Sequence, residues 1–578
     1  MNNKIKLSLA IALVAPLFSS CLQEYTPTSS VTQGQVDAAD KEALVRAIPA
    51  YLNQYITDYN SDIGFGGMVM WRESSTCDFA IYSNVYDYYW QVGWCEGLGA
   101  QDSKSPGLIM YRKYYSLAQK CNLVIQACNP SNEEDHEAFV MAKAYRGMAY
   151  LELGQWFEYK PTRFETLDSR AEANGVYGIT VPIVTEKTTD AESRNNPRAP
   201  FWKLYRFVLT DLNEAEKYSV GMAEPGVKTQ AGPGVVYGLQ ARLWLTLGTR
   251  FELHPEDLSE ALSHEADTDV TFDKLGVTTA RDCFELAASY ARKAINRGYA
   301  PLTESQWFDP TTGFNTPNNA WMLANIINSD NGLAKSKTWQ SFASYISPEP
   351  QYGISTPQYK GYRLIDSRLF DLIGAKDWRK TTWIAPGDEG SSSAYNAKYA
   401  RGTNLDFDKW SQYVAYTGFK FHPAQGNINE PSVGNAVSIP MMRVEEMYLI
   451  EAEAIGRAQG EGAGRALLEQ FMNTYRYSDG SYKSKGAGIE GFVNDVFTQK
   501  RIEFWGEGII MWDYKRLEMP VTRGYSGTDW DPVYRYNSNA NAVAPWLNLV
   551  IPQREATYNI GIVNNPDPSH NGNYSLWE

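Results

Sequence analysis

Two glutamates near the C-terminal end, Glu503 and Glu507, have the residue type and the spacing that could carry out chemistry. Residues four apart lie on one face of a helix, with Cβ atoms about 6 Å apart. A retaining glycosidase uses two carboxyl groups about 5 to 5.5 Å apart, one as nucleophile and the other as general acid and base. The pair is therefore compatible with a glycoside hydrolase.

Three arginines of the same stretch, Arg443, Arg501 and Arg516, favour a structural role for the two glutamates. Like charges four residues apart repel each other weakly, and a cation between them removes that repulsion. Catalytic carboxylates also tend to lie on loops or strand ends above a pocket, whereas this pattern predicts a continuous helix. We therefore expect Glu503 and Glu507 to form ion pairs, and the chain not to be an enzyme.

The stretch that positions these glutamates, residues 439–517, is predicted to form two helices separated by a glycine-rich turn. In the first helix Met442, Glu446 and Leu449 recur at three- and four-residue steps, and the second has the same period. Each helix would bury one face. The charges on these otherwise apolar helices then need partners, because a buried charge without one is costly.

Amphipathic helices also dominate the N-terminal half, where they come in pairs. The predicted helices are residues 111–128, 138–157, 201–218, 235–247 and 282–297. Recurrent helix pairs are typical of a tetratricopeptide-like stack, in which each pair buries its apolar face on its neighbours. The sequence predicts a mostly α fold on such a scaffold, with an irregular, loop-rich region that binds a ligand.

Two stretches between the helices, residues 71–99 and 301–438, lack a regular period and are rich in aromatic side chains. The first contains Trp71, Tyr82, Tyr86, Tyr88, Tyr89, Trp90 and Trp94. The second contains Trp307, Trp321, Trp339, Tyr345, Tyr352, Trp383, Tyr395 and Trp410. Such rings either stack on sugars or fill the core, and we expect about half of those in the first stretch to be core. We expect Trp321 to be buried and Trp339, in a polar context, to be exposed.

The first twenty residues predict a signal for export. Lys4 and Lys6 precede a short apolar run at residues 7–18, which is too brief to span a bilayer. Small residues then precede Cys21, as in a bacterial lipobox, so we expect cleavage before Cys21 and its lipidation. An ordinary signal peptide with an incidental cysteine is the alternative. The polar residues that follow predict a flexible tether.

Composition excludes several classes of function. The chain has 578 residues and a formal net charge of -14, and no stripe rich in Lys and Arg stands out, so we expect no nucleic-acid partner. The five histidines are scattered and no cysteine pair has the spacing of a zinc site, so we predict neither a metal nor a cofactor. The 17 Trp and 38 Tyr are the outliers.

Several ordered blocks resemble the SusD/RagB family of surface lipoproteins of Bacteroidota. RVEEMYLIEAEA at residues 443–454 and KRIEFWGEG, followed four residues later by DYKR at 513–516, are similar to the C-terminal signature of that family. Further blocks that resemble it lie at residues 111–125, 142–157, 198–218, 364–383 and 549–565. One departure is visible: where many members carry an arginine after the Glu-Gly pair, this chain has Ile509, Ile510 and Met511.

The resemblance implies a protein that captures nutrients, usually glycans, for a SusC-like TonB-dependent transporter of the outer membrane. It implies a cell-surface location through a lipid anchor at Cys21, and a ligand held by Trp90, Trp94 and Trp339. A member of the family that captures peptides would look the same in sequence. A glycoside hydrolase that uses Glu503 and Glu507 is the second alternative.

The expected domain organisation follows from these segments. Residues 1–20 are the signal peptide, 21–40 the tether and 41–578 one SusD-like domain. Within that domain we expect N-terminal helical pairs at 41–300, an irregular region at 301–438, a helix pair at 439–517 and an irregular tail at 518–578.

Overall fold

The computed structural model is mostly helical, which confirms the predicted fold class. It describes residues 41–54, 62–81, 87, 89, 97–101, 105–268, 270–328, 339–524, 527–530, 536–537 and 542–569. The predicted signal peptide, Cys21 and the tether therefore lie outside the described residues, as do Trp90 and Trp94. Within the described ranges, no helix is both long and apolar enough to cross a membrane.

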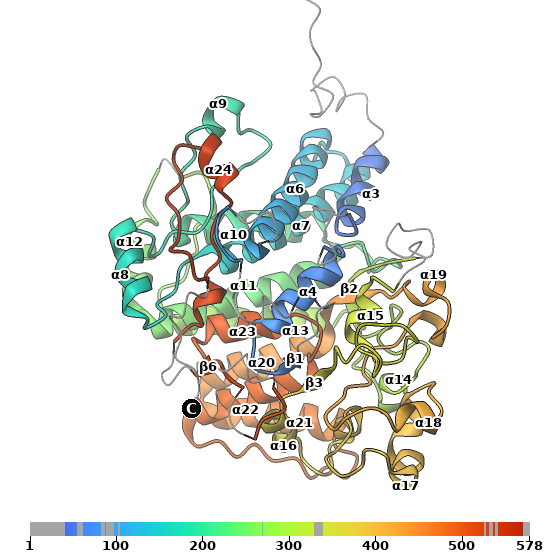
Figure 1. Cartoon of the computed structure of the whole chain (residues 1–578). Coiled ribbons are helices and arrows are strands. Elements are labelled where there is room, and N and C mark those ends of the chain that lie inside the picture. The colour runs from blue at the N-terminus through green and yellow to red at the C-terminus, as the bar shows by residue number, and fades with distance from the viewer. Residues whose placement is uncertain are drawn as a thin grey trace, which may run out of the picture.

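Eight helices form a stack in which each contacts its neighbours (Figure 1). They are α6 (Pro106–Ala127), α7 (His136–Phe157), α10 (Phe201–Tyr218), α11 (Pro233–Leu253), α13 (Ala280–Ile295), α20 (Val444–Gln459), α21 (Glu461–Tyr475) and α22 (Gly488–Glu503). The predicted pairing of α6 with α7 and of α10 with α11 is confirmed, because each pair packs together and α10 also packs on α7. Apolar faces at helical spacing explain the stack, since each helix buries such a face on the next.

The irregular region is an insertion between two helices of one pair. Helix α13 packs on α11 and on α20, although α20 begins only at Val444. Two strands close the base of the insertion: β2 (Trp321–Asn325) pairs antiparallel with β4 (Ile439–Arg443). Trp321 is fully buried there, as predicted. Helices α14 (Glu304–Trp307), α15 (Phe342–Ile346), α17 (Ser392–Ala394), α18 (Phe407–Trp410) and α19 (Pro431–Gly434) of the insertion lie at the right in Figure 1, beside the stack.

The segment after residue 438 differs from the predicted helix pair in two places. Residues 439–443 form strand β4 and not the start of a helix, because Pro440 disfavours the helical conformation for the residue before it and the β-branched Ile439 suits a strand. The predicted second helix ends at Glu503. Gly506 and Gly508 then take φ values of 81° and 71°, and a separate helix α23 (Ile510–Arg516) follows.

The glycine-rich stretch after α20 also differs from the prediction, which made Gly460, Gly462 and Gly464 one turn. Only Gly460, with a φ of 105°, separates the helices, and the other two lie within α21. A Cβ on Gly464 would lie 2.6 Å from Phe492, so its lack of a side chain lets α22 approach α21 closely.

Shorter elements complete the described chain. The remaining helices are α3 (Lys41–Tyr51), α4 (Phe65–Ser74), α8 (Glu165–Asn174), α9 (Asp190–Ser193), α12 (Pro255–Ser263), α14 (Glu304–Trp307), α15 (Phe342–Ile346), α16 (Ser367–Leu372), α17 (Ser392–Ala394), α18 (Phe407–Trp410), α19 (Pro431–Gly434) and α24 (Gln553–Tyr558). Strand β1 (Phe79–Ile81) pairs with β3 (Arg363–Ile365), and β5 (Thr522–Arg523) pairs with β6 (Tyr536–Asn537). The pairing of β1 with β3 ties the first aromatic stretch to the insertion.

Candidate functional site

Glu503 and Glu507 do not share the face of one continuous helix. Glu503 is the last residue of α22, and Glu507 lies in the turn that Gly506 and Gly508 make before α23. Both side chains are fully buried. No substrate could therefore reach the pair, and the prediction of a shared helix face is wrong.

Three arginines surround the carboxylate of Glu503. Arg476 donates from Nε to Oε2 and from Nη2 to Oε1, both at 2.8 Å. Arg379 donates to Oε2 at 2.8 Å, and Arg443 donates to Oε1 at 3.1 Å. All three guanidinium groups are buried. They pair with the Glu503 carboxylate, which would otherwise be a buried charge without a partner.

Glu507 has two cationic partners of its own. Arg443 donates from Nε to Oε2 at 2.8 Å and from Nη2 to Oε1 at 2.9 Å. Lys420, from the insertion, donates from Nζ to Oε1 at 2.6 Å and also to the backbone oxygens of Glu503 and Trp505. The expectation that both glutamates form ion pairs is confirmed.

The pKa values agree with a structural role. Burial by itself would raise the pKa of Glu503, but Arg476 and Arg443 outweigh it and hold this pKa well below the usual 4.5. Burial lowers the pKa of Lys420 to about 8, against the opposing effect of Glu507. A general acid needs a carboxyl group whose pKa is raised, and Glu503 has the opposite shift.

Sequence reasoning found part of this cluster. Of the three arginines expected to pair with Glu503 and Glu507, Arg443 does so. Arg501 instead pairs with Asp78, and Arg516 pairs with Glu453. The partners that it missed are Lys420, Arg379 and Arg476. The sequence offered one signal for Arg379, which is the aspartate two residues earlier. In the structure Arg379 donates two hydrogen bonds to the carboxylate of Asp377.

Trp339 is the predicted ligand-binding residue that the structure describes. It is 6% exposed, so the expectation of an exposed ring is wrong. Its ring packs beside α19, where a Cβ on Gly434 would lie 2.6 Å from Trp339 Cη2. The polar neighbours in sequence did not reveal that a glycine on another element makes room for the ring. Its role in ligand binding stays a prediction.

The described parts of the first aromatic stretch belong to the core. Trp71 and Tyr89 are buried, and Tyr89 meets Trp71 and Tyr345 edge-on at centroid distances of 5.4 and 5.0 Å. Asp87 forms a buried ion pair of 2.6 Å with Arg363 on β3. These contacts hold the described residues of the stretch against the insertion.

Among the described rings of the second stretch, Tyr352 has the most exposed side chain. It is 53% exposed, whereas Trp378 is partly buried and the other rings named above for this stretch are buried: Trp307, Trp321, Trp339, Tyr345, Trp383, Tyr395 and Trp410. Gln351 next to Tyr352 lines a small hollow of about 170 Å³, together with Gln358 and Gln412. An exposed ring beside amide groups is a combination that suits sugars. The signal in the sequence was the run of proline and glycine around it, which is typical of a surface loop.

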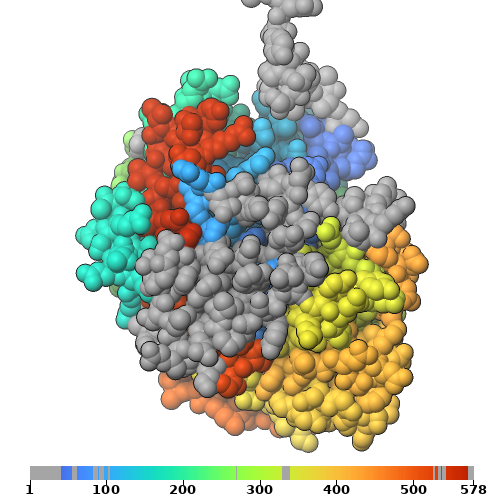
Figure 2. Space-filling view, in the orientation of Figure 1, coloured from blue at the N-terminus to red at the C-terminus, as the bar shows by residue number. Residues whose placement is uncertain are grey.

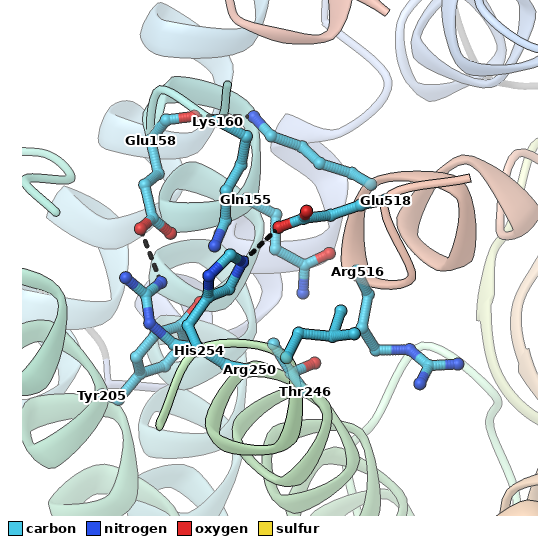
Figure 3. A pocket seen from close by; sticks show the side chains of 11 residues that line it. Gln155, Glu158, Lys160, Tyr205, Thr246, Arg250, His254, Arg516 and Glu518 are labelled. Carbon is cyan, nitrogen blue, oxygen red and sulfur yellow. Dashed lines mark hydrogen bonds and ion pairs between the residues drawn. The ribbon is translucent and has the colours of Figure 1, made fainter. Parts of the chain in front are cut away.

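A polar pocket between α7, α11 and α23 is too small for a sugar (Figure 3). Its volume of about 30 Å³ has room for one or two water molecules. His254 Nε2 lies 2.6 Å from Glu518 Oε1, and Arg250 Nη1 lies 2.5 Å from Glu158 Oε1. These pairs join the ends of the three elements, so the pocket is part of the scaffold.

Side chains that could hold a metal or react as nucleophiles do not form a site in the described part of the chain. No group of three or more His, Cys, Asp or Glu side chains there could hold a metal ion. The described cysteines are free: Cys77, Cys121, Cys128 and Cys283. Burial raises the pKa of the Cys77 thiol to about 11, so it is not a reactive thiolate at neutral pH.

Comparison with known proteins gives a family match for part of the chain and a fold for nearly all of it. Residues 311–567 match the model of the SusD family. A search of the curated proteins by sequence found no match. Among solved structures, the chain is similar to a SusD-like carbohydrate binding protein from Bacteroides vulgatus, with a TM-score of 0.63 and 18% identity over 90% of this chain and 96% of that one.

A second solved structure carries a ligand. Surface glycan-binding protein A from Bacteroides thetaiotaomicron, in complex with laminarihexaose, matches with a TM-score of 0.58 and 16% identity, over 91% of this chain and 98% of that one. A SusD superfamily protein from the same organism matches with a TM-score of 0.60 and 15% identity, over 92% and 99%. At these identities the likeness establishes the fold of this chain.

Proposed function

We propose that the chain is a member of the SusD family, whose model residues 311–567 match, and that it captures oligo- or polysaccharide at the cell surface and delivers it to a SusC-like TonB-dependent transporter. The family consists of binding proteins without catalytic activity. The buried, fully paired state of Glu503 and Glu507 agrees with this and removes the glycoside hydrolase alternative.

One observation carries the glycan assignment: the fold matches over nine-tenths of this chain that of a protein with a bound laminarihexaose. We propose Trp90, Trp94 and Trp339 as ligand-binding residues, and we add Tyr352 because its ring is exposed beside amide groups. Aromatic faces would stack on the C–H faces of sugar rings, and the amides would bind the hydroxyl groups. Capture for transport requires release, so a shallow platform suits the task better than a closed pocket.

The proposed location depends on the N-terminal segment. Export, cleavage before Cys21 and lipidation of that cysteine would place the protein on the outer membrane, and residues 21–40 would tether it. Several acyl chains together give stable attachment, whereas one chain gives only marginal binding. A Cys21→Ser variant should lose incorporation of labelled palmitate and appear in the soluble fraction. Palmitate incorporation equal to that of the wild type would contradict the anchor.

The function is tested by calorimetry on the detergent-solubilised chain against plant, host and microbial polysaccharides, with analysis of reducing ends. We expect binding of at least one glycan without new reducing ends. Trp90→Ala, Trp94→Ala or Tyr352→Ala should each weaken binding by about 1 to 3 kcal/mol, as at other stacking sites. Val220→Ala, which trims a side chain that is 79% exposed, is the control and should bind like the wild type.

Two outcomes would overturn this proposal. Binding confined to peptides would assign the chain to the peptide-capturing alternative. Wild-type affinity in all the aromatic variants, with a glycan that the wild type binds, would remove the proposed platform. The transporter partner is tested by co-purification of a TonB-dependent barrel from the outer membrane, and its absence from the complex would argue against delivery.

A further inference from the structure

A hollow between α6 and α24 combines features of a second ligand site. Its volume of about 530 Å³ is within the range of small-molecule sites. We call it the α6–α24 groove and define it by Tyr111, Arg112, Tyr115, Arg554, Glu555 and Tyr558, which all line it. Figure 2 displays the C-terminal segment in red next to the light-blue start of α6 on one face of the molecule.

The walls of the groove are held in fixed positions. The N–H of Asn196 donates to Asn559 Oδ1 at 2.9 Å, and Asn559 Nδ2 donates back to the Asn196 oxygen at 2.7 Å. The N–H of Ile560 donates to the Arg194 oxygen at 2.9 Å. A helix of six residues has little stability of its own, so these bonds account for the position of α24. A ligand would meet a preformed site.

Two arginines face the groove without an ionic partner. Arg112 on α6 and Arg554 on α24 are exposed, and neither pairs with any carboxylate among the described residues. Elsewhere in this acidic chain many arginines are paired, including those around Glu503 and Glu507. A guanidinium group binds a carboxylate or a sulfate through two parallel hydrogen bonds. Two such groups on opposite walls are suited to an anion.

Tyrosines supply aromatic surface in the same groove. The rings of Tyr111 and Tyr115 lie 4.4 Å apart between centroids, and the Tyr115 hydroxyl donates to the Pro182 oxygen at 2.5 Å. Tyr558, four residues after Arg554 on α24, is 68% exposed. Residues four apart share a helix face, so the free ring and the free guanidinium group would meet one ligand together.

Among the described residues that line the groove, Glu555 carries the one negative charge, and the two arginines leave a net positive charge there. Glu555 Oε1 accepts a hydrogen bond from Asn559 Nδ2 at 3.3 Å. The Glu555 carboxylate would accept hydrogen bonds from the hydroxyl groups of a sugar.

We propose that the α6–α24 groove binds an anionic sugar unit, whose uronate carboxylate or sulfate ester lies between Arg112 and Arg554 while Tyr558 covers a ring face. Glu555 accepts from ring hydroxyl groups. The residues that define the groove differ from Trp90, Trp94 and Trp339, so a site here would let the protein hold an acidic polysaccharide at two points. It goes beyond the proposed function by naming the charge of the ligand.

The test uses the full chain in detergent and three probes: oligogalacturonides, chondroitin sulfate oligosaccharides and neutral laminari-oligosaccharides. We expect one of the two anionic probes to bind, and the Arg112→Gln/Arg554→Gln double variant to bind it at least about tenfold more weakly. Tyr558→Ala should weaken the same binding severalfold. Arg170→Gln, at an exposed arginine of α8, is the matched control and should change nothing. The two anionic probes distinguish a carboxylate from a sulfate ligand.

The variants also separate this inference from the proposed function. Neutral glycan binding that is unchanged in the double variant, together with failure of both anionic probes, would overturn the groove and leave the platform intact. Anionic binding that depends on the two arginines but not on Trp90 and Trp94 would support the groove as a second site. Wild-type binding of an anionic probe by the double variant would overturn the groove.

Discussion

Arg443 binds Glu507 through two hydrogen bonds, from Nε to Oε2 at 2.8 Å and from Nη2 to Oε1 at 2.9 Å, although one residue ends a strand and the other lies in a distant turn. Arg443 is the last residue of β4, and Glu507 lies in the turn after α22. Lys420 joins the same carboxylate from the insertion. The cluster therefore fastens the loop-rich region to the helix stack, and its charges serve stability.

Glu507→Gln should destabilise the fold, because it leaves Arg443 and Lys420 buried beside an uncharged group. Breaking a buried ion pair costs about 3 to 5 kcal/mol, so we expect a loss of that size in the free energy of unfolding in urea. Glu490→Gln, in the exposed first turn of α22, is the control and should stay within about 0.5 kcal/mol of the wild type. A Glu507→Gln variant as stable as the wild type would refute the structural role. A glycan that the wild type hydrolyses and the variant does not would refute it too.

Gly506→Ala should also destabilise the fold, because the turn that carries Glu507 requires glycine. Gly506 has a φ of 81°, and an added Cβ would lie 2.5 Å from the ring of Phe421. The backbone conformation costs about 1 to 2 kcal/mol and the overpacking about 1 to 3 kcal/mol. Gly462→Ala is the matched control, since this helical glycine faces open space and alanine there should stabilise by up to about 1 kcal/mol. Thermal unfolding of both variants measures these effects. A Gly506→Ala variant that unfolds at the wild-type temperature would contradict the requirement for glycine in this turn.

The sequence contains enough information to predict the helix stack. The prediction for residues 201–218 coincides with α10, because apolar residues recur there at helical spacing. The strand at residues 439–443 was missed because its partner, β2, lies far away in sequence. The pairing of α13 with α20 was hidden by the insertion between them. The pairing of Lys420 with Glu507 could not be predicted for the same reason, because no local sequence pattern indicates which distant carboxylate a lysine binds.

Glu73 should make stability depend on pH. It is fully buried on α4, and its Oε1 accepts from the N–H of Gly508 at 2.6 Å. Burial, with a smaller effect of Asp78, raises the pKa of Glu73 to about 8. Between pH 4.5 and 8 the folded state then keeps a proton that the unfolded state releases. The contribution of Glu73 to stability is therefore full below pH 4.5 and falls by about 1.4 kcal/mol per pH unit up to pH 8.

Glu73→Gln removes this dependence and keeps an oxygen for Gly508. In urea unfolding at pH 5, 6.5 and 8, we expect the variant to gain stability relative to the wild type as pH rises. In the Glu490→Gln variant, which changes an exposed residue, the free energy of unfolding should vary with pH as it does in the wild type. Parallel curves for Glu73→Gln and the wild type would mean that this carboxyl group is ionised in the folded protein.

Trp339 combines a buried ring with a predicted role in ligand binding, and two variants separate these properties. Trp339→Ala should cost about 3 to 5 kcal/mol of stability, because it empties the space beside Gly434. It should also weaken glycan binding by about 1 to 3 kcal/mol if the ring contacts the ligand. Trp339→Phe keeps an aromatic ring, so we expect near-wild-type binding with a smaller loss of stability. Calorimetry at a temperature where both variants are folded measures the affinities. Unchanged affinity in Trp339→Ala would remove this residue from the binding site, and unchanged stability would contradict its packing role.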